Sequence, residues 1–319
     1  MSEPGTDSGV SVRPMQQSDL AEADRVFRLA FGTRLRLPDP MRFRGDSRLL
    51  QPRFATYPDA AFVALAEDRL VGSIIGMDWG RVFILGPLSV DPAYAGRGIA
   101  RRLMRELMGR VDARGFDLVA LFTVPDSPTH IRLYESFGFV LQMLTPVMAK
   151  AIVPGGSGVE PLTLYSGLDS AGQAEALTGC RAVAESVFPG LDLSREIRAI
   201  SEQHLGEVVL LRAGGAVAGF ALCHAGAGSE AGSSNLFVKF AAVRPGDSAG
   251  FARLLDQYEE LGRAVGAQRL VAGCNTGHKP AYALMRERGF RAEMVGVAMH
   301  RPDQPGYNRP EIFVIDDWR

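Results

Sequence analysis

The chain has few of the residues that usually mark metal or redox chemistry. Its 319 residues include only three cysteines and five histidines. The cysteines, Cys180, Cys223 and Cys274, lie far apart in the second half. Zinc sites and disulfide frameworks need closely spaced ligands or paired cysteines, so this pattern excludes both. We expect three buried, reduced thiols and no metal site.

An excess of charge of either sign is also missing. The chain carries 35 basic and 36 acidic residues, for a formal net charge of −1. No global field therefore recruits nucleic acid or an anionic membrane. No apolar run approaches the length of a membrane-spanning helix, and the polar leader over residues 1–9 lacks the apolar stretch of a signal peptide. We expect a soluble cytoplasmic protein, monomeric or homodimeric, with a small molecule or a protein as its partner.

Apolar periodicity predicts alternating strands and helices in the first half of the chain. We expect the first helix to be capped by Ser18 and ended by Gly32, and a second helix to run from Ile99 to Gly115. A short helix is predicted over residues 128–136. The expected strands cover residues 10–13, 61–66, 70–77, 82–90, 118–124 and 139–149.

The second half repeats the first with a slowly slipping offset. Val90-Asp91-Pro92 matches Val243-Arg244-Pro245 at an offset of 153, and Gly98 matches Gly250 at 152. Gly138-Phe139 matches Gly289-Phe290 at 151. Duplication followed by small loop changes gives such a pattern. The predicted fold class is α/β (α+β), in two tandem copies, each a mostly antiparallel twisted sheet with helices on both faces. The predicted divisions are a disordered leader 1–9, a first domain 10–152, a linker 153–160 and a second domain 161–319.

A Gly-rich turn between the strand that ends at Val90 and the helix that begins at Ile99 predicts an anion site. Gly96 and Gly98 lack the Cβ atoms that would block close approach of a ligand to the backbone. The turn therefore presents consecutive N–H groups at the positive end of the helix. Arg97, Arg101 and Arg102 add positive charge where the helix dipole alone favours acids. This arrangement indicates a polyanionic ligand.

Together with the stretch Leu133-Tyr-Glu-Ser-Phe-Gly-Phe139, this turn resembles the GNAT acyltransferases. Their pyrophosphate loop reads Gln or Arg, x, x, Gly, x, Gly or Ala, and Ala95 here replaces the Gln or Arg. The resemblance implies acetyl-CoA as co-substrate, bound in part through the main chain of the strand that carries Leu88 and Val90. Ser127 stands where the family has an Asn that contacts CoA. The implied acetyl-CoA-binding residues are Leu88, Ser89, Val90, Ala95, Gly96, Arg97, Gly98, Ile99, Ala100, Arg101 and Ser127.

Tyr134 is the predicted catalytic residue. Collapse of the tetrahedral intermediate expels CoA thiolate, which a nearby protonated phenol can protonate. The base that receives the proton of the amine is less specified by the sequence: His130, one helical turn before Tyr134, Asp78, or water are the alternatives, and the amine can also arrive neutral. Six arginines between residues 33 and 55 indicate either a solvated face or an acceptor that is anionic.

The second copy lacks both the phosphate-binding turn and the tyrosine of the first. Its turn is one residue shorter and brings Asp247 near the phosphate position, and Met285 replaces the tyrosine. We therefore expect an N-terminal copy that is active and a C-terminal copy that is degenerate. The predicted reaction is acetyl (acyl) transfer from CoA to a primary amine of a small molecule by direct attack. Acylation of protein lysines and a catalytically silent acyl-CoA-binding regulator are the alternatives.

Overall fold

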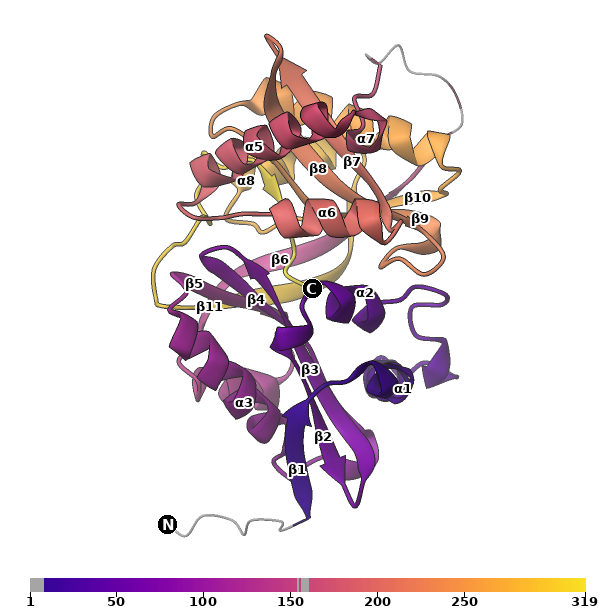
Figure 1. Cartoon of the computed structure of the whole chain (residues 1–319), viewed down its shortest axis with the longest axis vertical. Coiled ribbons are helices and arrows are strands. Elements are labelled where there is room, and N and C mark those ends of the chain that lie inside the picture. Colours follow the sequence, from indigo (N-terminus) through magenta and orange to yellow (C-terminus); the bar gives the residue numbers. More distant parts are fainter. Residues whose placement is uncertain (1–8, 154, 156–160) are drawn as a thin grey trace. The chain divides into compact units, whose positions relative to one another are not determined.

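The computed structural model describes residues 9–153, 155 and 161–319 (Figure 1). The predicted leader 1–9, except Gly9, and most of the predicted linker 153–160 lie outside the described residues. The described chain forms two compact units. Among the described residues, the first comprises 9–45, 49–77 and 85–115, and the second comprises 46–48, 78–84, 116–153, 155 and 161–319.

After β1, helices and strands follow one another in the same order in both halves of the chain. In the first half the elements are β1 (Val10–Pro14), α1 (Leu20–Arg34), α2 (Leu50–Thr56), β2 (Ala61–Ala66), β3 (Arg69–Trp79), β4 (Val82–Val90), α3 (Ile99–Arg114), β5 (Leu118–Thr123), α4 (Pro128–Glu135) and β6 (Val140–Ala151). In the second half they are α5 (Ser170–Val187), α6 (Ser194–Glu202), β7 (Gly206–Ala213), β8 (Ala216–Gly226), β9 (Gly232–Val243), α7 (Ser248–Ala264), β10 (Arg269–Gly273), α8 (Lys279–Glu287), β11 (Arg291–Arg301) and β12 (Val314–Ile315).

The first unit places helices on both faces of an antiparallel sheet, as the sequence predicts. β2 pairs with β1 on one side and with β3 on the other. Ala61 and Val63 of β2 join the core that α1 and α2 form on one face. Gly72 of β3 lies on the other face, where a Cβ atom would stand 3.1 Å from Leu103 and 3.3 Å from Ile99 of α3. Figure 1 shows α1 and α3 on opposite sides of these strands.

Both predicted limits of the first helix are wrong. Ser18 lies in a 3-10 turn over Gln17–Asp19, and α1 begins only at Leu20. Gly32 lies inside α1, where a Cβ atom would stand 2.3 Å from the carbonyl oxygen of Pro40. The glycine is therefore required by a close approach of two backbone segments and does not end the helix.

The second unit contains a reciprocal exchange of strands between the two predicted copies. β11 lies between β5 and β6 and is antiparallel to both. β6 in turn pairs antiparallel with β10, and β10 pairs parallel with β9. The last strand of each copy thus completes the sheet of the other copy, with β9, β8 and β7 following as antiparallel neighbours.

The register of this exchange follows the repeat found in the sequence. Leu121 pairs with Met299, and Ala272 pairs with Met148; positions 121 and 272, like 148 and 299, differ by 151. At the centre Thr145 pairs with Gly296, the residue of the second copy that corresponds to Thr145 at the same offset of 151. A pseudo-twofold axis therefore passes between β6 and β11 at this pair. The tandem repeat is confirmed at the level of individual strand pairs.

The chain ends in a buried segment that the sequence did not predict. After β11 the polypeptide returns to β9, and β12 pairs antiparallel with it through Val314 and Ala242. Ile312, Ile315 and Trp318 are each no more than 4% exposed. Terminal residues are usually poorly ordered unless they are tied to a sheet or a core. This C-terminal segment is tied to both.

Candidate active site

The predicted phosphate loop lies in the first unit and opens α3. Gly96 and Gly98 have φ angles of 79° and 74°, in the left-handed region that favours glycine. A Cβ atom at either position would meet no atom within 4 Å, because the loop faces open space. Gly98 is the N-cap of α3, makes no side-chain cap hydrogen bond, and is followed by a first turn without acidic residues. The first N–H groups of this helix are therefore available to an anion.

The turn before this loop is fixed by Asp91. Its carboxylate is 2% exposed and accepts a hydrogen bond from the backbone N–H of Ala93 at 3.0 Å. The Arg25 guanidinium contacts the same carboxylate at 3.3 Å. These contacts hold the 3-10 turn over Pro92–Tyr94, from which the loop leaves.

The loop side chains take different directions. The Arg97 guanidinium lies 4.9 Å from the centre of the Tyr94 ring, a cation–π contact that leaves Arg97 exposed. Ala95 and Arg101 are also exposed, whereas Ile99 is buried and Ala100 is half-buried. Arg102 instead donates a hydrogen bond to the carbonyl oxygen of Val10 at 2.7 Å. Arg97 and Arg101 are therefore the loop cations that remain exposed to solvent.

The predicted pantetheine strand is β4. Leu88 and Val90 are half-buried, and Ser89 between them is 3% exposed. The Ser89 hydroxyl lies 3.0 Å from the Ser73 hydroxyl of β3. Since neighbouring side chains of a strand point to opposite faces, Ser89 faces the interior while Leu88 and Val90 share the other face.

Tyr134 lies in the second unit, on the face of α4 that packs against the sheet. It is 8% exposed, its ring packs edge-on against Phe139 at 6.2 Å, and its hydroxyl is hydrogen-bonded to the Thr123 side chain. Burial raises the pKa of Tyr134 to about 12, and the bond to Thr123 opposes this rise. The phenol is therefore protonated at neutral pH, as a proton donor must be. Sequence reasoning missed Thr123, since no local pattern links the last residue of β5 to Tyr134, eleven positions later in α4.

The remaining predicted site residues of the second unit have varied environments. Ser127 is the N-cap of α4 and is 8% exposed, with no side-chain cap hydrogen bond. His130 is half-buried one helical turn before Tyr134. Asp78 is half-buried at the end of β3, where its carboxylate accepts a hydrogen bond from the Gly80 N–H at 3.1 Å. The Asp78 contact is one that turn-forming aspartates commonly make.

The corresponding groups of the second copy have different chemistry. Asp247 caps α7 and accepts a hydrogen bond from the Gly250 N–H at 2.8 Å, so its own carboxylate occupies the end of this helix. At an offset of 151, Cys274 replaces Thr123 and the fully buried Met285 replaces Tyr134. Both members of the tyrosine–threonine hydrogen bond are thus absent from this copy.

The arginine-rich segment is mostly at the surface. Arg34, Arg36, Arg42 and Arg48 are exposed, and Arg44 is half-buried. Arg53 is different: it is 1% exposed and donates a hydrogen bond to the Gly86 carbonyl oxygen of β4 at 2.9 Å. Arg53 therefore supports the β4 backbone from within the first unit.

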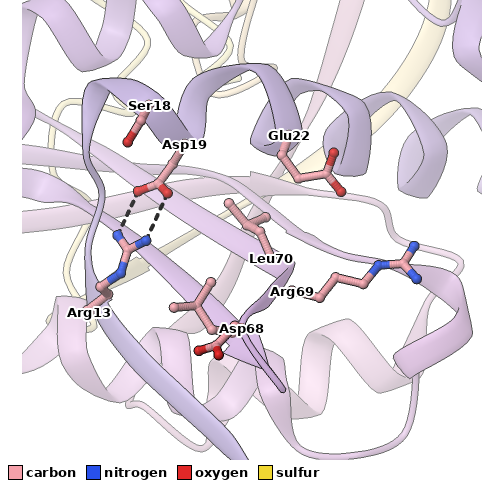
Figure 2. A pocket seen from close by; sticks show the side chains of 8 residues that line it. Arg13, Ser18, Asp19, Glu22, Asp68, Arg69 and Leu70 are labelled. Carbon is pink, nitrogen blue, oxygen red and sulfur yellow. Dashed lines mark hydrogen bonds and ion pairs between the residues drawn. The ribbon is translucent and has the colours of Figure 1, made fainter.

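A pocket of about 550 Å³ opens in the first unit between β1, the start of α1 and the β2–β3 turn (Figure 2). Figure 2 shows Arg13 and Asp19 joined by two hydrogen bonds, of 2.7 and 2.8 Å, and these lower the pKa of Asp19. Asp68, Arg69 and Glu22 complete its charged lining. Three acidic and two basic groups do not favour a polyphosphate. None of the predicted site residues lines this pocket.

The described residues were also compared with the expectations for the cysteines, for metal sites and for membrane-spanning helices. All three cysteines are buried and unbridged, which confirms their predicted burial. Within the described part of the chain, no group of three or more His, Cys, Asp or Glu side chains is arranged to hold a metal ion. No helix there is long and apolar enough to cross a membrane.

Comparison with known proteins bears on the fold and the loop. Residues 30–139 match the model of the acetyltransferase (GNAT) family. An acetyltransferase of Sodalis glossinidius is 32% identical over 96 residues, which cover 30% of this chain and 68% of that protein. A mycothiol acetyltransferase of Thermobispora bispora is 32% identical over 95 residues, covering 25% of this chain and only 30% of that protein.

Two solved structures share the fold over nearly the whole chain. A protein of Pyrococcus horikoshii has a TM-score of 0.71 at 17% identity, covering 100% of this chain and 98% of its own. A tandem GNAT protein from the clavulanic acid biosynthesis pathway has a TM-score of 0.56 at 14% identity, covering 92% and 100%. The motif that opens α3, the tandem fold and these matches agree. The chain belongs to the acetyltransferase (GNAT) family, whose chemistry is acetyl transfer from acetyl-CoA.

Proposed function

We propose that this chain transfers an acetyl group from acetyl-CoA to a primary amine of a small molecule, and that the N-terminal copy performs the reaction. The observation that carries the proposal is the contrast between two helix ends. α3 begins at an exposed, uncapped Gly98, whereas α7 begins at Asp247, whose carboxylate takes the Gly250 N–H. An anion is stabilised at the first end and repelled at the second.

The first end fits the pyrophosphate of acetyl-CoA. Gly96 and Gly98 leave room for close approach to the backbone, and Arg97 and Arg101 supply exposed positive charge. We assign the main chain of Leu88 and Val90 to the pantetheine arm, as the family resemblance implies. Ala95, which replaces the family's Gln or Arg, contributes only its backbone.

We assign Tyr134 the role of general acid. The amine nitrogen attacks the thioester carbonyl carbon and forms the C–N bond, and the C–S bond breaks as the intermediate collapses. The departing sulfur takes the phenolic proton, and the surplus proton of the amine passes to a base. Burial raises the pKa of Tyr134 to about 12 and so keeps the phenol protonated until the C–S bond breaks. Because a free thiol has a pKa of about 8.5, transfer of the phenolic proton to sulfur is uphill, and the phenolate then regains a proton from solvent. No covalent enzyme intermediate is needed.

The base is assigned less narrowly. His130 lies on the same side of α4 as Tyr134, and a neutral imidazole can accept the proton directly or through water. Asp78 is weaker in this role because its carboxylate already accepts a hydrogen bond from the Gly80 N–H. A His130→Gln variant that loses turnover at high pH, where an imidazole is neutral and can accept a proton, and matches the wild type at low pH would support the imidazole.

The acceptor is the second part of the proposal. The match to a mycothiol acetyltransferase favours a small-molecule acceptor over a protein lysine. The exposed arginines between residues 33 and 48 favour an acceptor that also carries a negative charge.

Release of CoA thiol, measured with a panel of amines and of lysine-containing peptides, tests the function. We expect turnover with a small amine, higher for anionic amines, and loss of turnover in Tyr134→Phe. Turnover with peptides alone would favour the lysine acetyltransferase. Acetyl-CoA binding without CoA release for any acceptor, in the wild type, would favour the silent regulator and would overturn the proposal.

A further inference from the structure

The C-terminal segment, residues 311–316, runs along the edge of β9 that corresponds to the cofactor strand of the first copy. At the offset of 153 found in the sequence, Leu88 and Val90 correspond to Ala241 and Val243. Ile315 pairs with Ala241 in an antiparallel register, and the Val243 N–H donates a hydrogen bond to the Phe313 carbonyl oxygen at 3.3 Å. The main-chain positions assigned to the pantetheine arm in the first copy are thus satisfied here by the protein itself.

The segment also fills the gap that opens between β9 and β10. These strands pair in parallel only as far as Val238 and Ala272. Beyond that point β12 pairs with β9, while Asp316 forms a parallel bridge with Cys274, the residue that follows β10. Cys274 is the counterpart of Thr123. The segment therefore reaches from the cofactor strand to the position that corresponds to the catalytic end of the first copy.

Contacts at the other end of the segment continue toward the helix that corresponds to α3. The Gly246 N–H, in the turn before α7, donates a hydrogen bond to the Glu311 carbonyl oxygen at 2.8 Å. The Phe313 ring packs against Phe251, in the first turn of α7, at 5.5 Å. Phe313 and Ile315 belong to the buried core of this unit, and neither is more than 4% exposed. A segment held by two hydrogen-bonded edges and a core occupies its groove continuously.

We propose that the C-terminal segment is an intramolecular ligand of the second copy, filling the groove that corresponds to the acetyl-CoA groove of the first. The proposal rests on the proposed function for the identity of that groove. Met285 at the tyrosine position and the Asp247 cap do not explain why the second copy keeps a groove shaped for an extended ligand. On this proposal the groove is kept because it binds a segment of the chain itself. One acetyl-CoA binds per chain because the second groove is already occupied.

Hydrogen exchange of the full-length chain tests the proposal directly. We expect the amides of Val243 and Gly246 to exchange as slowly as those of paired β9 residues, and far more slowly than the exposed turn at Gly214 and Gly215. Acetyl-CoA should slow exchange over residues 95–102 and leave residues 241–246 unchanged. Exchange of 241–246 as fast as the exposed turn would overturn the proposal, as would protection of these residues by acetyl-CoA with two molecules bound per chain.

A variant pair sharpens the test. Ile315→Asp places a charge at a fully buried position of the segment, whereas Pro310→Asp places it at an exposed position just before the segment. We expect Ile315→Asp to speed exchange over 241–246 by roughly tenfold or more, and Pro310→Asp to leave it unchanged. If Ile315→Asp does not fold, the wild-type exchange pattern still decides. Fast exchange at 241–246 with intact turnover rejects this proposal and leaves the proposed function standing, whereas slow exchange at 241–246 without CoA release for any acceptor rejects the proposed function.

Discussion

At the scale of single residues, Tyr134 is a buried phenol whose polar atom has a specific partner. A buried hydroxyl that lacks a hydrogen bond loses the solvation it had in water, so the Thr123 contact stabilises the orientation of the phenol as well as its burial. Tyr258, in the second copy, provides the contrast: its hydroxyl is buried and has no hydrogen-bond partner among the described residues. The two tyrosines therefore form a matched pair for mutagenesis.

Tyr134→Phe should keep the affinity for acetyl-CoA and lower kcat by roughly ten- to a thousand-fold, because it removes the proton donor and keeps the ring packed against Phe139. Turnover at saturating substrate and calorimetric titration with acetyl-CoA measure the two effects. Tyr258→Phe, the control, should leave kcat unchanged. Full turnover in Tyr134→Phe would remove the phenol from the mechanism.

Thr123 is a positioning residue if its hydroxyl acts through Tyr134. Thr123→Val keeps the shape of the side chain and should lower kcat by roughly two- to tenfold, the usual range for one lost hydrogen bond. In the Tyr134→Phe background the same change should lower kcat no further, because the bond is already gone. An equal loss in both backgrounds would show that Thr123 acts through packing alone.

At the scale of elements, α3 and α7 show how one helix end is kept open and another is closed. α3 follows β4, and α7 follows β9, the corresponding strand of the second copy. Both helices begin at a turn that contains glycine. The two helix ends differ in their capping residue: Asp247 caps α7, whereas Gly98 has no side chain with which to cap α3. Glycine in place of a capping side chain costs only a few tenths of a kcal/mol of helix stability, which a bound anion can return.

Gly98→Asp should abolish acetyl-CoA binding and leave the protein folded, because it places bulk and negative charge at the phosphate position. Calorimetry measures the affinity and circular dichroism the fold. Gly98→Asn tolerates the left-handed backbone without the charge and should weaken binding less. Gly109→Asp, on the exposed side of α3 where a Cβ meets no atom within 4 Å, is the matched control and should bind normally. Wild-type affinity in Gly98→Asp would show that the phosphates bind elsewhere.

The C-terminal segment contains a titrating group. Burial raises the pKa of the Asp316 carboxyl from 3.8 to about 7, while hydrogen bonds from Tyr307 and Trp318 lower it and the neighbouring Asp317 raises it. Tyr307 donates to Asp316, and Trp318 donates to Tyr307 at 2.7 Å. Cys274 also faces Asp316, and burial raises the pKa of that thiol, so it stays neutral. In the folded protein the Asp316 carboxyl is therefore mostly protonated below about pH 7.

Because the folded-state pKa lies above the unfolded value, the stability that protonated Asp316 contributes is present below pH 3.8 and is lost as the pH rises through about 7. Relative to Asp316→Asn, the wild type should lose unfolding free energy across this window, by at most about 1.4 kcal/mol per pH unit. Urea unfolding at several pH values measures the difference. Parallel pH profiles for the two proteins would show that Asp316 does not titrate there.

At the scale of the whole molecule, the two copies depend on each other for completed sheets. β11, from the second copy, lies between β5 and β6 of the first, and β6 pairs with β10 of the second. The exposed apolar edges that a separated copy would present favour aggregation. This exchange gives a physical reason for keeping a copy in which Met285 stands at the position of Tyr134.

Deletion of residues 160–319 should give an aggregating or inactive protein, because it removes the strand between β5 and β6. The intact chain should bind one acetyl-CoA, and Met285→Tyr alone should restore no second site. Size-exclusion chromatography, calorimetric stoichiometry and turnover measure these outcomes. A fully active fragment ending near Lys150, or two acetyl-CoA molecules per intact chain, would contradict the assignment of the second copy as a structural partner.

The sequence by itself determined the elements whose signals are local. Strands β2 and β4 have the predicted bounds, and α3 begins after Gly98 and ends at Gly115, because periodicity and glycine at a helix end act within a few residues. The tandem repeat, the family and the Asp247 cap were also predictable, since each depends on which residues follow one another. The failure at Gly32 has the opposite cause: a distant backbone, at Pro40, decides what that glycine is for.

Only the tertiary structure decided which strands are neighbours and what fills the second groove. The exchange of β6 and β11, the hydrogen bond between Thr123 and Tyr134, and the return of residues 311–316 to β9 all join segments far apart in the chain. No neighbouring stretch of sequence indicates a pairing partner for the apolar run from Ile312 to Ile315. A strand only two residues long, such as β12, forms because the edge of β9 is available for pairing. Such pairings are set by packing and backbone hydrogen bonding across the fold, which no local pattern encodes.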